Sequence, residues 1–403
     1  MRMTRRTLLG AAAGAALVGP RAFAQAKEVK IGFIAPLSGP WARQGELMKK
    51  GADLAVEDIN AAGGIKALGG AKIKLAVADA GENAEKAKNA AQRLLAENPD
   101  MAGGLGAWLS SFTLAVTEVT ERAGLPWVTL SYSDAITDRG FKNVFQTSAI
   151  GSAQAGMTID LAMEAAVKAG KPKPKSFGWI SDNTAAPASF VKYYRETGLA
   201  KAGLELTVDE VYTPPLADAT SPVQKARRAK PDLLMIYATA TPDLKSVMEK
   251  IKEFNMDKGK QPLIANGAHN GTPELLNLVG KDLLENFTFS IANWPAKRHV
   301  ELEKRFGEKM KEPWMGQDPL CAYGDIQLFK TVIENMGSAD PAKVAEGLRK
   351  IDEPAGYYAG GRTKFDEKGR RVGANIVLVQ WQNGTPVAVF PEDAAVSKLN
   401  LPK

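Results

Sequence analysis

Residues 29–65 read VKIGFIAPLSGPWARQGELMKKGADLAVEDINAAGGI and contain a complete strand–turn–helix unit. The short apolar run 29–35 is followed by a proline, which predicts a buried strand. Ser-Gly-Pro at 38–40 is a turn signal. Apolar residues then recur at helical spacing over 44–62, and glycines 63–64 end the helix because glycine tolerates left-handed backbone angles. The stretch therefore predicts the first half-module of an α/β sheet.

Strand and helix patterns alternate through the rest of the chain. Further strands are predicted at 73–77, 101–105, 127–130, 176–180, 204–212, 233–238 and 262–266. This alternation predicts mostly parallel sheets with helices on both faces. The 403-residue chain is too long for one such sheet, so we expect an α/β fold of two lobes.

The first 26 residues have the pattern of an export signal. Paired arginines at 5–6 match the twin-arginine type, and the apolar stretch 8–18 is shorter than the ~20 residues that span a bilayer. We expect cleavage of residues 1–26 and a periplasmic mature protein. Cys321, the only cysteine, lies far from the leader, so neither a lipid anchor nor an internal disulfide is expected.

Composition and motifs argue against several other classes. The leader holds four of the 52 basic residues and no acid, which leaves 48 basic against 45 acidic residues, or +3. This weak charge predicts no nucleic-acid partner. The two histidines, His269 and His299, are far apart, so no metal spacing exists, and neither a cofactor nor an enzyme is expected. One rival remains open, a hydrolase whose nucleophile is Ser131 or Ser133.

Candidate binding groups follow predicted strands. In an open α/β sheet, ligands bind beyond the carboxyl ends of the strands. Ser110 follows one strand and starts a helix, where free amides and the helix dipole favour an anion, although Ser110 could also be only a helix cap. Ser131 and Ser133 follow the next strand, where the alternative is an ordinary turn. Planar side chains in these loops, Trp108 and Tyr132 among them, favour a flat ligand.

Several segments resemble a known family. They are the opening stretch 29–65, LSSFTLAVTEVTERAGLPWV at 109–128, DAITDRGFKNVFQTS at 134–148 and TKFDEKGRRVGANIVLVQWQNG at 363–384. Together they resemble the type I periplasmic solute-binding proteins, and most of all the branched-chain amino acid receptors of ABC importers. The resemblance implies two Rossmann-like lobes with parallel sheets and a three-segment hinge. It also implies an inner-membrane permease as partner, and we expect a monomer.

The resemblance also implies lobe boundaries and site residues. Lobe 1 would comprise 27–147 and 293–371, and lobe 2 would comprise 148–292 and 372–403. In this family serines matching Ser110, Ser131 and Ser133 hold the ligand's carboxylate. The full set of predicted ligand-binding residues is Trp41, Gln44, Trp108, Leu109, Ser110, Ser131, Tyr132, Ser133, Asn183, Thr239, Asn266 and His269.

The chain departs from the amino acid receptors in its second lobe. The loop 266–269 lacks the acid that pairs with the ligand's ammonium, 181–187 lacks a tyrosine, and 238–241 lacks an aromatic residue. Burying an unpaired ammonium costs several kcal/mol, so we expect a small carboxylate, such as an aromatic acid, unless Asp182 substitutes. The alternatives left open are an amino acid or amide receptor and a sensory ligand-binding module.

Overall fold

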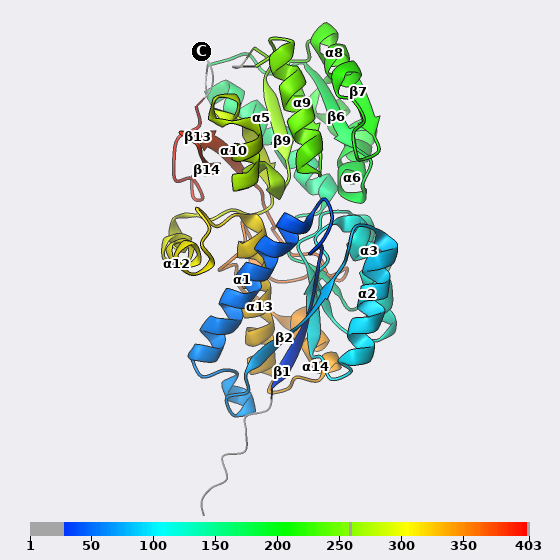
Figure 1. Ribbon diagram of the computed structural model, residues 1–403, viewed down its shortest axis with the longest axis vertical. Coiled ribbons are helices and arrows are strands. Elements are labelled where there is room, and N and C mark those ends of the chain that lie inside the picture. The colour runs from blue at the N-terminus through cyan, green and yellow to red at the C-terminus, as the bar shows by residue number, and fades with distance from the viewer. Residues whose placement is uncertain (1–27, 169, 258–259, 401–403) are drawn as a thin grey trace, which may run out of the picture.

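The protein has two α/β lobes stacked along its long axis (Figure 1). The computed structural model describes residues 28–168, 170–257 and 260–400, so the predicted leader lies outside the described residues. Within these ranges no helix has both the length and the apolar character needed to cross a membrane.

The first lobe contains a parallel five-stranded sheet in the order β2-β1-β3-β4-β5. Its strands are β1 Val29–Ala35, β2 Ile73–Asp79, β3 Gly103–Gly106, β4 Trp127–Thr129 and β5 Val144–Gln146. Its helices are α1 Ala42–Ala61, α2 Ala84–Glu97, α3 Ser110–Arg122, α4 Ala135–Asp138, α12 Val300–Met310, α13 Gln317–Met336 and α14 Pro341–Lys350. The strand and helix predicted from residues 29–65 are confirmed as β1 and α1.

The second lobe contains a seven-stranded sheet in the order β14-β13-β10-β9-β8-β6-β7. Its strands are β6 Ser176–Asp182, β7 Glu205–Tyr212, β8 Leu233–Tyr237, β9 Leu263–Asn266, β10 Thr288–Ile291, β13 Val377–Gln382 and β14 Thr385–Phe390. Its helices are α5 Gly151–Lys168, α6 Ala185–Tyr193, α7 Leu199–Ala202, α8 Thr220–Ala229, α9 Thr241–Glu253, α10 Pro273–Val279 and α11 Lys281–Leu284. The strands from β6 to β10 are parallel, whereas β13 and β14 form an antiparallel hairpin at one edge.

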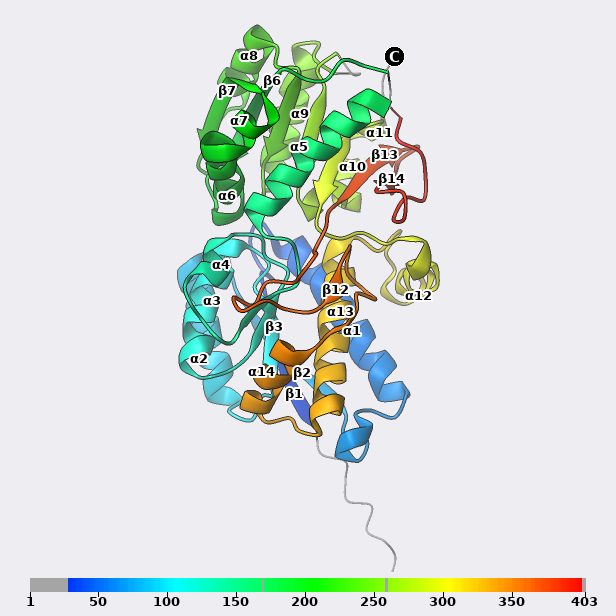
Figure 2. The ribbon, with the colours of Figure 1, turned by 180° about the vertical axis from the view of Figure 1, so that it is seen from behind.

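The chain passes between the lobes in three described segments. It enters the second lobe after β5, returns after β10 to build α12–α14, and leaves again through the segment that contains the short strands β11 Glu353–Pro354 and β12 Arg362–Thr363 (Figure 2). Arg371 ties two of these segments together, because its Nε donates to the Thr147 carbonyl and its terminal nitrogens donate to Ala359 and Gly360 carbonyls, each at 2.6 Å.

The glycine-rich strand β3 is explained by close packing. A Cβ added at Gly103 would lie 2.4 Å from a Phe329 ring carbon, and one added at Gly104 would lie 2.3 Å from the Trp127 ring. These separations are far below van der Waals contact, so only glycine allows helix α13 and strand β4 to approach the strand this closely. Close backbone approach therefore accounts for the glycines of β3.

The second sheet is buried on both faces. Along β8, Leu234 and Ile236 belong to one hydrophobic cluster, whereas Met235 and Tyr237 belong to another on the opposite face. Alternation between two apolar layers is typical of a parallel sheet covered by helices on both sides. Residues that follow β3, β4, β8 and β9 line a common space, so the carboxyl ends of these strands face the junction between the lobes.

Candidate functional site

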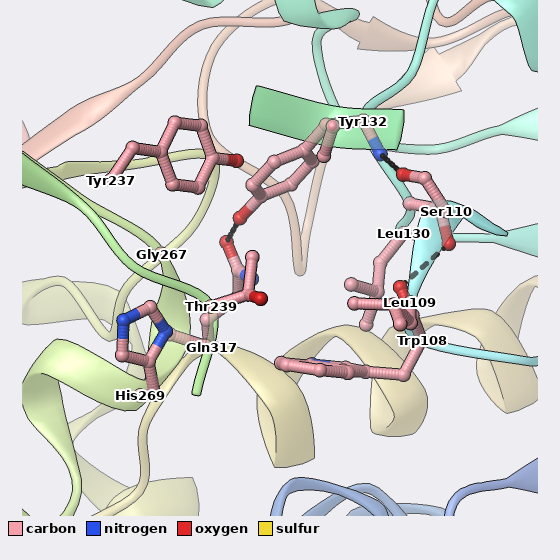
Figure 3. A pocket seen from close by; sticks show the side chains of 13 residues that line it. Trp108, Leu109, Ser110, Leu130, Tyr132, Tyr237, Thr239, Gly267, His269 and Gln317 are labelled. Atoms are coloured by element: carbon pink, nitrogen blue, oxygen red, sulfur yellow. Dashed lines mark hydrogen bonds between the residues drawn. The ribbon is translucent and has the colours of Figure 1, made fainter. Parts of the chain in front are cut away.

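A cavity lies between the lobes, where the strand ends of both sheets meet. Its first-lobe wall contains Trp108, Leu109, Ser110, Leu130, Ser131 and Tyr132, together with Gln317 at the start of α13. Its second-lobe wall contains Ala186, Tyr237, Thr239, Gly267, Ala268 and His269 (Figure 3). Seven of the twelve predicted site residues are therefore brought together.

The turn between β3 and α3 is strained and positions Trp108. Ala107 and Trp108 both have positive φ, 66° and 51°, which is costly for residues with a Cβ. This conformation is stabilised by long-range contacts, since Trp108 Nε1 donates to Asp318 Oδ1 at 3.0 Å. Strain of this kind concentrates at functional sites. Here it places the flat indole along one side of the cavity (Figure 3).

Ser110 is oriented as a hydrogen-bond donor toward the cavity. Its Oγ accepts hydrogen bonds from the backbone amides of Tyr132 and Ser133, each at 3.1 Å. A hydroxyl accepts two bonds and donates one, so the proton is what remains for a ligand. Ser110 also opens α3, and the first amides of a helix have no intrahelical acceptor. Hydroxyl, amides and helix dipole together favour the negative end of a ligand.

The Ser131 hydroxyl forms hydrogen bonds within the protein. Its Oγ donates to the Trp108 carbonyl at 2.8 Å and lies 2.6 Å from Thr113 Oγ1. The Ser131 proton therefore holds the strained turn in place, although the residue lines the cavity. Of the two serines, Ser110 has the free donor.

Polar groups of both lobes line the rest of the cavity. Tyr132 donates from its hydroxyl to Gln317 Oε1 at 2.7 Å, and the Tyr237 hydroxyl faces the same space (Figure 3). Burial lowers the pKa of His269 and the adjoining Ala238 carbonyl raises it. The effect of burial is the larger one and brings the pKa to about 4, so the ring is neutral at pH 7. His269 is only 2% exposed.

No aspartate, glutamate, lysine or arginine is among the described residues that line the cavity. Asp182, which could have replaced the missing acid, is fully buried and committed elsewhere. Its Oδ1 accepts from the Thr184 amide at 2.8 Å and from the Thr184 hydroxyl, and its Oδ2 accepts from the Thr239 amide at 2.7 Å. Burial raises the pKa of this carboxyl, more than these hydrogen bonds lower it. Asp182 therefore supports the 239 loop and does not face a ligand.

Trp41 and Gln44 lie away from the cavity, contrary to the prediction. The Trp41 ring packs edge-on against Phe112, 5.7 Å between ring centres, in the first-lobe core. Gln44 is buried on the first turn of α1. Both face inward because α1 begins directly after the turn and buries this face.

Three other predicted residues also lie outside the cavity wall. Ser133 Oγ is 3.1 Å from Ser189 Oγ of the other lobe. Asn183 is solvent-exposed, and its amide donates to Thr213 at 2.7 Å. Asn266 is completely buried, with Nδ2 3.1 Å from Ser290 Oγ.

His299, the second histidine of the chain, lies away from the cavity and is buried. It is 3% exposed, its Nδ1 accepts from the Ala296 amide at 3.1 Å, and its Nε2 lies 2.8 Å from the Gly356 carbonyl. The ring sits between two chain segments that lie far apart in the sequence, which no local pattern reveals.

Two cavity residues that sequence reasoning missed are informative. Tyr237 supplies the aromatic ring thought to be missing from 238–241, because β8 ends one residue before that loop and turns this ring toward the cavity. Alternation along the strand could have indicated it. Gln317 reaches the cavity from a helix 185 residues beyond Tyr132, and no sequence signal marks it. Leu130, Ala186, Gly267 and Ala268 complete the wall.

Polar contacts join the lobes around the cavity. Arg43 Nε on α1 pairs with Glu274 Oε1 on α10 at 2.8 Å, and the same guanidinium pairs within its own lobe with Glu46 at 3.0 Å and Glu312 at 2.6 Å. The Asp134 carboxylate accepts from the Ser152 amide at 2.9 Å. The described conformation is therefore one in which the lobes touch.

Residues 28–386 match the model of the family described as periplasmic binding protein. The chain is a periplasmic binding protein. The match covers both lobes and the cavity, and the resemblance stated from the sequence is confirmed. The protein is therefore a solute-binding receptor.

Relatives of this periplasmic binding protein match over nearly their whole length. Leu/Ile/Val-binding protein homolog 7 of Brucella melitensis is 30% identical, covering 96% of this chain and 98% of the relative. An isoleucine complex of the branched-chain amino acid transporter substrate-binding protein from Streptococcus pneumoniae is 20% identical, with a TM-score of 0.77 over 91% of this chain and 100% of that one. A solute-binding protein of R. palustris in complex with benzoate is 18% identical, with a TM-score of 0.74 over 92% and 98%. At these identities the two structures show a shared fold.

Proposed function

We propose that this periplasmic binding protein delivers a small carboxylate, with aromatic acids as the favoured class, to an ABC importer permease. The observation that carries the proposal is the polarity of the cavity. Ser110 and the start of α3 offer donors for a carboxylate, whereas none of the described residues in the wall has an acidic side chain to hold an ammonium. An unpaired buried ammonium costs several kcal/mol, which disfavours a zwitterion.

The aromatic class is favoured by the shape of the wall. Trp108, Tyr132 and Tyr237 present three rings to one small space. Aromatic pairs contribute ~0.5–1.5 kcal/mol beyond the burial of area. Ligand contacts to both lobes would stabilise the closed conformation, because only that conformation supplies both sets of contacts.

The rest of the proposal concerns processing and organisation. We propose twin-arginine export, cleavage of residues 1–26, no lipid anchor, no catalytic activity and a monomeric receptor. Lobe 1 is assigned to 27–147 with 293–371, and lobe 2 to 148–292 with 372–403. Three chain segments at the junction would act as the hinge.

An amino acid receptor is the second candidate, because the relative at 30% identity is named for leucine, isoleucine and valine. A thermal-shift screen of the mature protein against leucine, valine, benzoate and aliphatic acids separates the two. Ligand at 100 times its Kd adds ~2.7 kcal/mol of stability, which raises the Tm by several degrees. A shift with leucine and none with any simple carboxylic acid would refute the proposed ligand class.

A further inference from the structure

Among the described residues of the second-lobe wall, two buried polar atoms make no hydrogen bond of normal geometry. They are Thr239 Oγ1 and His269 Nε2, on residues that are 5% and 2% exposed. Other unpartnered buried atoms occur elsewhere in the described chain, but only these two belong to residues that line the cavity. Leaving a buried donor or acceptor unsatisfied costs ~1–3 kcal/mol, and such atoms are rare in native proteins.

Both atoms lie opposite the carboxylate donors. Thr239 and His269 follow β8 and β9 of the second lobe, whereas Ser110 begins α3 of the first lobe (Figure 3). Asp182 holds the Thr239 amide at 2.7 Å, which positions that side chain. A ligand bound by Ser110 at one end would therefore present its other end to these two atoms.

The chemistry of the two groups selects an uncharged partner. A threonine hydroxyl donates one hydrogen bond and accepts up to two, and Nε2 of a neutral imidazole donates or accepts one according to the tautomer. A hydroxyl on the ligand matches them because it does both. A second carboxylate or an ammonium would face a wall without a counter-charge, since the oxygens of nearby Asp182 are already bonded to Thr184 and Thr239.

We propose that the ligand carries a hydroxyl at the end opposite its carboxylate, and that Thr239 and His269 bind this hydroxyl. The inference rests on the proposed function and narrows it to hydroxylated aromatic acids. A site built to bond a substrate hydroxyl discriminates strongly against the analogue that lacks it, because the polar groups of the site are then left unpaired.

Isothermal titration with benzoate, 3-hydroxybenzoate and 4-hydroxybenzoate tests the proposal. At least one hydroxybenzoate should bind the wild type about ten-fold or more tighter than benzoate. Thr239→Val keeps the volume but removes the hydroxyl, so it should abolish most of the difference between the Kd of benzoate and the Kd of the preferred hydroxybenzoate. Thr239→Ser is the matched control and should retain the preference. His269→Phe should reduce the preference as well.

The outcomes separate this inference from the proposed function. Equal binding of benzoate and both hydroxybenzoates, or a preference that survives both Thr239→Val and His269→Phe, overturns the hydroxyl site alone. Binding of leucine with no binding of any benzoate overturns the proposed ligand class, and the hydroxyl site with it. Melting temperatures of the ligand-free variants verify that each is folded.

Discussion

Ser110 has two separable roles, and replacing it with alanine tests both. The Ser110 Oγ accepts the Tyr132 and Ser133 amides and retains one proton for the ligand's carboxylate. Ser110→Ala leaves two buried amides without an acceptor, at ~1–3 kcal/mol each, so the free energy of unfolding should fall by about 2–6 kcal/mol. The lost charge-assisted bond is worth ~1.5–3 kcal/mol, which should weaken carboxylate binding about 10- to 150-fold.

Urea denaturation of the ligand-free protein measures the first effect, and calorimetric titration with a carboxylic acid identified by the thermal screen measures the second. Ser131→Ala is the matched control, because Ser131 is equally buried in the same wall but donates to the Trp108 carbonyl. It should reduce stability yet change the Kd less than about three-fold. If Ser110→Ala lowers stability while leaving the Kd unchanged, Ser110 is a structural serine and the reasoning about its proton is wrong.

Three further predictions concern the lobe contact, a buried acid and a helix contact. Glu274→Gln breaks the interlobe pair with Arg43 and should raise the Kd by at most about five-fold, which titrations in low and high salt will check. The control Glu46→Gln removes a same-lobe partner of Arg43 and should leave the Kd unchanged. Burial raises the pKa of Asp318 to about 7, so the folded state keeps a proton that the unfolded chain loses above pH 4, and stability should fall as pH rises from about 4 to 7. Asp318→Asn should flatten that part of the urea midpoint profile and stabilise the protein at pH 8 by a few kcal/mol; an unchanged profile would contradict the assigned shift. Gly51→Ala would place a Cβ 2.0 Å from the Pro319 carbonyl oxygen and should cost ~1–3 kcal/mol or more in urea, whereas Gly356→Ala, with nothing within 4 Å, should cost little.

The sequence alone partly predicted where in the cavity the negative end of a ligand would bind. Ser110 sits between a strand signal and a helix signal, and this placement alone indicated an anion site at the helix start. The sequence did not reveal that Ser131 would give its proton to the Trp108 carbonyl, because that bond joins two loops 23 residues apart. Only the folded structure shows that Ser110 retains a free hydroxyl proton whereas Ser131 does not.

Aromatic residues show the same limit. Trp41, Trp108 and Tyr132 all occupy loops at strand ends, yet Trp41 packs into the core against Phe112 while Trp108 and Tyr132 line the cavity. All three residues are aromatic, and all three follow a strand. Their directions differ because each ring follows the nearest apolar surface, and that surface is supplied by elements distant in sequence.

By itself the sequence determined the fold class, the strand and helix order, and the loops from which the cavity is built. Those features depend on periodicity and turn residues, which act over a few positions of the chain. Tertiary structure alone decided which side chains line the cavity, as with Tyr237 and Gln317. It also decided that the Asp182 carboxylate bonds to a neighbouring loop instead of facing the cavity. The physical reason is that a side chain's direction and free hydrogen-bonding capacity are set by partners from the opposite lobe or from distant segments, which come together only when the two lobes fold and meet.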